Sequence, residues 1–95
     1  MIIQVIRLKS NLPEDQLLQI ANERAPQFRA LKRLKQKYYV KQGGPGGYAG
    51  IYIWESKEAM MAYKESDLAA SIPQAYQIAS PPDIEIMEGM FQLRE

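Results

Sequence analysis

The chain has 95 residues, which is the size of one small domain, and we treat residues 1–95 as a single domain. It contains no histidine and no cysteine, which excludes Ser–His and Cys–His nucleophile pairs, thiol redox motifs and the usual zinc ligands, so we expect no metal site. Lys and Arg number 12 against 11 Asp and Glu, and a net charge of +1 gives no general attraction to nucleic acids or membranes.

The N-terminal segment does not have the pattern of a secretion signal. Arg7 and Lys9 interrupt the apolar stretch that such a signal needs. No apolar run approaches the roughly 20 residues that cross a bilayer. Together with the absence of cysteine, this predicts a cytoplasmic protein without a membrane partner.

The first third of the chain predicts a strand and a helix. Residues 2–8 are rich in β-branched side chains and apolar on both faces, which indicates a buried strand. A helix is expected to begin near Pro13, since proline is favoured in the first helical turn. We expect it to end near Arg24, because Pro26 would damage a helix interior.

The middle of the chain predicts a β-hairpin. Residues 34–42 and 48–54 are rich in strand-forming side chains, and the glycine-rich segment 43–47 lies between them. That segment lacks the Gly-Lys-Ser/Thr ending of a phosphate-binding loop and precedes a strand instead of a helix. A flexible hairpin tip is therefore the favoured interpretation.

The last part of the chain predicts a helix, a long connection and a strand. Ser56 is the expected N-cap of a helix that runs to about Ser66. The connection 67–83 is long for a compact domain, which makes it a candidate lid or arm. Residues 83–93 predict the final strand, with Gly89 as a bulge.

The order β-α-β-β-α-β predicts a ferredoxin-like α+β fold, with a four-stranded antiparallel sheet and two helices on one face. In strand 48–54 we expect the aliphatic side, with Ile51 and Ile53, to pack under the helices. The aromatic side, with Tyr52 and Trp54, would then remain in water. An uncovered apolar sheet face indicates a partner layer, and a second copy of the chain supplies it most simply, so we predict a homodimer.

The segment YAGIYIWESKEA at 48–59, followed by Ala62-Tyr63, resembles the third strand and second helix of the monooxygenase family of the YdhR type. That family belongs to the dimeric α+β barrel superfamily, beside the antibiotic-biosynthesis monooxygenases. Weaker similarity runs over the whole chain. The resemblance implies a homodimer with a small cavity per subunit between sheet and helices. It also implies cofactor-independent oxygenation, in which an ionised phenolic or enolic substrate donates an electron to oxygen.

The candidate substrate-binding residues are mostly aromatic, and they are weighed against plain core or interface packing. They are Trp54, Tyr52 and Tyr63, followed by Tyr39 and Tyr76. Arg7 lies among apolar strand residues, where it either reaches solvent at the sheet end or faces a cavity and clamps an anion. A catalytic tyrosine would need a nearby cation, such as Arg7, Lys37 or Lys41, to lower its pKa from about 10. The sequence assigns no catalytic base.

The sequence therefore predicts a cofactor-independent monooxygenase acting on a small aromatic or quinol-like compound. The alternative is a non-catalytic homodimeric small-molecule-binding module of the same fold, and a purely structural dimer without a cavity is a third. RNA-recognition domains share this element order, but their Lys/Arg-Gly-Phe/Tyr-Gly/Ala-Phe-Val core is missing from 48–54. We therefore expect no nucleic-acid partner.

Overall fold

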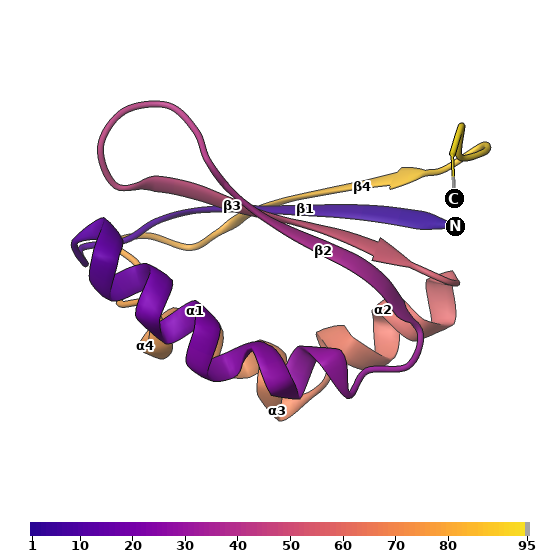
Figure 1. The fold of residues 1–95 in the computed structure, drawn as a ribbon, viewed down its shortest axis with the longest axis horizontal. Coiled ribbons are helices and arrows are strands. Elements are labelled where there is room, and N and C mark those ends of the chain that lie inside the picture. Colours follow the sequence, from indigo (N-terminus) through magenta and orange to yellow (C-terminus); the bar gives the residue numbers. More distant parts are fainter. Residues whose placement is uncertain (95) are drawn as a thin grey trace.

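The computed structural model describes residues 1–94. Its elements are β1 (Ile2–Lys9), α1 (Glu14–Arg29), β2 (Leu34–Lys41), β3 (Gly47–Trp54), α2 (Lys57–Lys64), α3 (Asp67–Ala70), α4 (Ile72–Ala75) and β4 (Asp83–Glu88). Within these residues the strands form one antiparallel sheet in the order β2-β3-β1-β4. The helices all lie on one side of it (Figure 1). The predicted ferredoxin-like α+β fold is therefore confirmed.

Helix α1 is longer than the sequence predicted. It continues through Pro26 to Arg29, so the expected end near Arg24 is wrong. Proline removes one hydrogen bond of the helix, but the turn beyond it carries Phe28, which is buried in the core against Tyr52. Burial of such a ring contributes about 1.5–3 kcal/mol, which offsets much of the cost of an internal proline.

The two faces of β3 are reversed relative to the prediction. The side chains of Tyr52 and Trp54 point toward the helices and are only 2% and 1% exposed, so their expected exposure to water is wrong. The helices contribute small residues to this core, among them Ala21 and Ala59. Small helical residues leave a deep space above the sheet, and large rings fill it better than isoleucine would.

The other side of the sheet carries aliphatic side chains and has no helix over it within residues 1–94 (Figure 1). We call this side the outer face. It includes Ile3, Val5, Tyr38, Ile51, Ile53 and Met87. An apolar face without cover still calls for a second layer, so the homodimer stays a prediction although its aromatic rationale was wrong.

The connection after α2 is packed against the body of the protein, in contrast to the predicted lid or arm. Its short helices α3 and α4 bring Ile72 and Tyr76 into the core. Arg24 of α1 holds them in place, because its Nη2 donates a hydrogen bond of 2.9 Å to the Ser71 hydroxyl. The guanidinium also lies 5.8 Å from the centre of the Tyr76 ring.

Strand β4 ends at Glu88, so the predicted strand to Leu93 with a bulge at Gly89 is wrong. Its pairing with β1 ends at the same point. Glu88 pairs with Ile2, the first residue of β1, and the Gly89 amide then donates a hydrogen bond of 2.8 Å to the Met1 carbonyl.

Two local signals were predicted correctly. The Ser56 hydroxyl accepts a hydrogen bond of 3.2 Å from the Ala59 amide and caps α2. The segment between β2 and β3 is a hairpin turn, in which Gly43 and Gly46 have φ angles of +67° and +84° that favour glycine.

Candidate functional site

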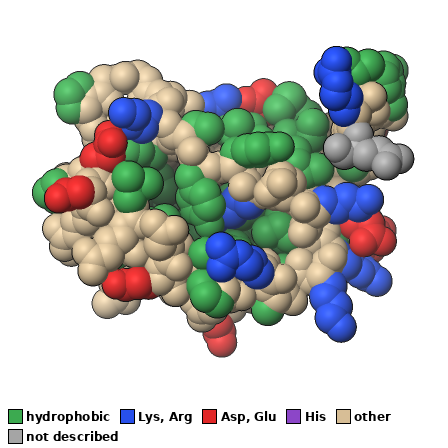
Figure 2. Space-filling model, in the orientation of Figure 1, with side chains coloured by type: hydrophobic (Ala, Val, Ile, Leu, Met, Phe, Trp, Pro, Cys, Tyr) green, Lys and Arg blue, Asp and Glu red, His purple; other side chains and the backbone are tan. Residues whose placement is uncertain are grey.

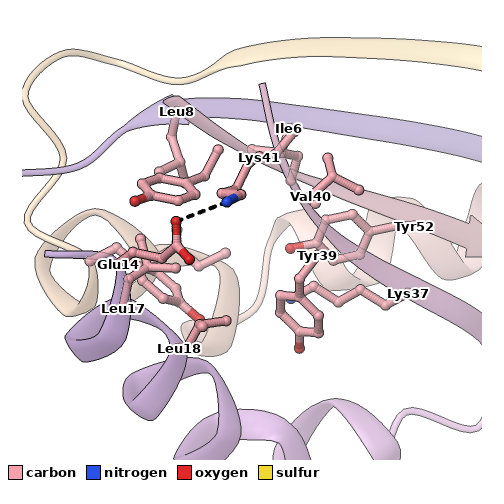
Figure 3. A pocket seen from close by; sticks show the side chains of 15 residues that line it. Ile6, Leu8, Glu14, Leu17, Leu18, Lys37, Tyr39, Val40, Lys41 and Tyr52 are labelled. Carbon is pink, nitrogen blue, oxygen red and sulfur yellow. Dashed lines mark ion pairs between the residues drawn. The ribbon is translucent and has the colours of Figure 1, made fainter. Parts of the chain in front are cut away.

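A cavity of about 310 Å³ lies between α1 and the strands β2 and β3. Its walls are mainly hydrophobic, and it forms a hollow on the face of the molecule seen in Figure 2. Leu17 and Leu18 approach from the helix, while Ile6 and Tyr52 form part of the sheet side (Figure 3). Ligand pockets span about 300–1,000 Å³, so this cavity suits a small molecule of one or two rings.

Gly50 creates room on the sheet side of the cavity. It lies in the inward-facing row of β3, where a Cβ atom would be 2.9 Å from Cε1 of Tyr52. The same atom would lie 3.5 Å from Cε of Lys37. A larger residue would therefore have to displace the Tyr52 ring, whereas its Cβ would be in ordinary contact with Lys37, which explains why the aromatic row of β3 is interrupted here.

Lys37 of β2 extends into this space beside Tyr39 and Tyr52 (Figure 3). Its Nζ lies 3.5 Å from the ring centre of Phe28, 4.4 Å from that of Tyr39 and 4.6 Å from that of Tyr52. No carboxylate of residues 1–94 forms an ion pair with it. Burial lowers the pKa of Lys37 from 10.5 to about 7, and the positive charge of Arg24 acts in the same direction. The amine therefore exists in both protonation states near neutral pH.

The tyrosine side chains behave in the opposite way. The hydroxyl oxygens of Tyr52 and Tyr63 are 3.3 Å apart in the core. Burial raises the pKa of Tyr63 to about 12, and it raises the pKa of Tyr52 further. Burial also raises the pKa of Tyr39 and of Tyr76. None of these four tyrosines is made acidic by a neighbouring cation, and their phenols are neutral at physiological pH.

The mouth of the cavity is crossed by an ion pair. Lys41 of β2 and Glu14 of α1 approach to 3.2 Å, as the dashed line in Figure 3 marks. Their side chains are 70% and 49% exposed, and such surface pairs contribute only about 0–1 kcal/mol. This pair can therefore separate at little cost when a ligand enters.

The five aromatic candidates form two groups. Tyr39, Tyr52 and Tyr76 line the cavity. Trp54 and Tyr63 lie behind Tyr52 in the core, where Trp54 stacks on it at 6.0 Å between ring centres and Tyr63 lies at 5.5 Å. The second group supports the cavity wall without lining it.

Arg7 is placed apart from all of these residues. It lies on the outer side of the sheet and forms ion pairs with Glu85 at 2.9 Å and Asp83 at 3.7 Å. Its ion pairs with two acids of β4 explain this position better than an anion in the cavity does, so Arg7 does not belong to the candidate site.

The sequence suggested Lys37 only as a cation that could lie near a tyrosine, whereas the structure places its side chain inside the cavity. The sequence does not show clearly that Lys37 faces the helices, because β2 has an irregular register between Leu34 and Gln36. The usable signal was the alternation after that irregularity, with Lys37, Tyr39 and Lys41 on one side of the strand.

Residues 1–94 contain neither a metal-binding cluster nor a membrane-spanning helix. No group of three or more acidic side chains comes together there as a metal site. None of the helices has both the length and the apolar character needed to cross a membrane.

No family model matches this chain, and no curated protein matches its sequence. Solved structures do share its fold. A Nitrosomonas europaea protein of unknown function, NE2512, is 18% identical with a TM-score of 0.79, covering 99% of this chain and 93% of that one. SnoaB, a cofactor-independent oxygenase from Streptomyces nogalater, is 12% identical with a TM-score of 0.76, covering 99% and 97%. A monooxygenase from the ActVA-Orf6 gene of Streptomyces coelicolor, solved with nanaomycin D, is 16% identical with a TM-score of 0.75, covering 99% and 91%.

The chain therefore has the fold of the antibiotic-biosynthesis monooxygenases. The resemblance noted in the sequence is confirmed at that level. At these identities the likeness concerns the fold, and function has to be argued from the cavity.

Proposed function

We propose that this protein is a homodimeric, cofactor-independent monooxygenase that acts on a small aromatic or quinol-like compound. The observation that carries the proposal is the apolar cavity of about 310 Å³ with an amine and several phenols in its lining. Two proteins of the same fold are described as a cofactor-independent oxygenase and as a monooxygenase, which supports the reaction class.

The proposed reaction requires no external reductant. Oxidation of a phenol to a quinone by one molecule of oxygen places one oxygen atom in the product and the other in water, and the substrate supplies all the electrons. The first electron leaves the substrate more easily once its hydroxyl group has lost a proton. The protein must therefore exclude water, stabilise the anion and accept that proton.

The lining residues support the first two requirements. Apolar side chains such as Leu17 and Ile6 line the cavity and disfavour water beside a bound substrate. Neutral tyrosine hydroxyls can donate hydrogen bonds to a substrate oxygen, and the raised pKa of Tyr76 keeps it a donor at neutral pH.

The proposal is tested by measuring oxygen consumption with a panel of phenols, naphthols and hydroquinones, without added flavin or metal. We expect uptake of one oxygen per product molecule for at least one of them. L18W is expected to abolish this uptake, because Leu18 lines the cavity and is 47% exposed, so an indole there fills the opening without entering the core. L18A is the matched control and should retain activity. Equal activity in both variants would place the reaction elsewhere.

The alternative is a binding module of the same fold that holds an aromatic metabolite without converting it. The raised pKa values of the tyrosines are compatible with this function, because neutral phenols bind ligands without reacting. Saturable thermal stabilisation by a phenol, with no oxygen uptake by any member of the panel, would select it.

We also propose that the outer face is covered by a second copy of the chain. Ile51 and Ile53 lie near its centre, and burying such side chains yields about 25 cal/mol per Å² of apolar area. Sedimentation of the wild-type protein is expected to give a particle of twice the 10.9 kDa chain mass. A well-folded monomer at micromolar concentration would contradict the assembly. Location in the cytoplasm stays a prediction.

A further inference from the structure

The cavity contains one lysine amine that is half-buried among aromatic rings. Two lysines line it, and Lys41 at the mouth is exposed and paired with Glu14. The Nζ of Lys37 instead lies inside, 3.5 Å from the centre of the Phe28 ring, and no acid of residues 1–94 pairs with it. A half-buried amine without a carboxylate partner has no structural pairing role, which leaves its chemistry available to a ligand.

We propose that Lys37 accepts the proton of the phenolic or enolic hydroxyl group of the bound substrate, and then holds the resulting oxyanion as an ion pair. The inference rests on the proposed function and names its proton acceptor. In this step the substrate O–H bond breaks heterolytically and an N–H bond forms on Nζ. The oxygen keeps the electron pair, so no oxidant or reductant takes part.

The surroundings of Nζ favour an amine that can change its protonation state. The charged and titratable groups near it are Arg24 from α1, Tyr39 on its own strand and Tyr52 from β3, and Tyr76 after α4 lines the same cavity. Arg24 is the charged one among them, and it disfavours a second cation nearby. An arriving oxyanion reverses this balance, because it attracts the protonated amine.

The three rings explain how the amine can also be stable once protonated. The faces of Phe28, Tyr39 and Tyr52 attract an ammonium group through their quadrupoles. A carboxylate in their place would hold the proton on the amine permanently and prevent it from acting as a base. Aromatic faces stabilise the ammonium less strongly, so Lys37 can lose its proton and regain it from the substrate.

The test uses 4-nitrophenol, whose acidity is close to that of Lys37 and whose phenolate has its own visible absorption band. Binding is measured without oxygen by calorimetry in two buffers of different ionisation enthalpy, which counts protons, at about pH 6 and about pH 8. The wild-type complex should contain nitrophenolate and protonated Lys37. It should therefore release a proton on forming at the lower pH and take one up at the higher pH.

Two variants give different proton counts. K37M keeps the length of the side chain but has no basic group, so it should bind neutral nitrophenol, with no proton change at about pH 6 and uptake at about pH 8. K37R stays cationic, so it should release a proton at the lower pH and show no change at the higher pH. We also expect K37M to lower the affinity at neutral pH by about tenfold or more.

The assignment to Lys37 is overturned if the wild-type protein shows either variant pattern, if K37M keeps the wild-type pattern, or if the folded wild-type protein fails to bind nitrophenol. These outcomes are separable from failure of the proposed function. The expected proton pattern without oxygen uptake by any phenol would leave Lys37 as the proton acceptor of a binding module. Oxygen uptake that K37M retains would keep the oxygenase and remove Lys37 from it.

Discussion

Replacing Lys37 by methionine is expected to change how stability depends on pH. The pKa of Lys37 falls from 10.5 in a solvated chain to about 7 in the folded protein, which corresponds to about 5 kcal/mol of stability. Below about pH 7 the lysine is protonated in both states and the folded protein carries this full cost. Between about pH 7 and about pH 10.5 the unfolded chain binds a proton that the folded protein does not, so stability rises with pH.

The change between about pH 7 and about pH 10 is smaller than this total, because part of the titration falls below and above that range. We therefore expect the wild-type protein to gain about 3–4 kcal/mol relative to K37M between about pH 7 and about pH 10.

Urea unfolding of the wild-type protein and K37M over this range measures the difference directly, because other titrating groups are shared and cancel. K35M replaces an exposed lysine of the same strand and is the control, with an expected effect within about 0.5 kcal/mol. A difference between wild type and K37M that stays constant with pH would refute the reasoning, since Lys37 would then be fully solvated.

Three other substitutions test separate parts of the structure. Gln4→Leu removes the acceptor of the 2.9 Å hydrogen bond from Trp54 Nε1, and the unpaired indole N–H should lower the free energy of unfolding by about 1–3 kcal/mol in urea titrations. Unchanged stability would mean that water replaces the amide. Gly50→Ala places a Cβ 2.9 Å from Cε1 of Tyr52 and should weaken phenol binding by about tenfold, measured by calorimetry. Unaltered affinity would argue against this cavity. Ile51→Lys puts a charge on the outer face and should yield monomers in sedimentation; a persistent dimer would mean that another surface associates.

The fold could be predicted from the sequence because its signals are local. The β-branched run of β1, the cap at Ser56 and the glycine turn at 43–47 each determine a short segment, and their order then allows few topologies. The same local reasoning failed at Pro26, where burial of Phe28 in the core sustains the last turn of α1. The end of α1 is therefore set by tertiary packing, which cannot be read from a helix-breaking residue in the sequence.

The candidate site could be predicted only in part, because it depends on which row of a strand faces the helices. The tyrosines at 39, 52 and 76 line one cavity, and their role in substrate binding stays a prediction. The prediction assigned the two faces of β3 the wrong way round, because the alternation of side chains shows that the faces differ but not which one is buried. Lys37 was missed as a central group because its low pKa arises from burial between elements that are far apart in the chain.

The two rows of side chains on strand β3 belong to different surfaces of the protein. Gly50 and Tyr52 border the cavity, while Ile51 and Ile53 belong to the opposite surface. Inserting or deleting a single residue within this strand would exchange the rows beyond that point, so isoleucines would enter the cavity and aromatic rings would move to the outer face. We therefore expect natural variation here to proceed by substitution, with length changes confined to the glycine turn at 43–47.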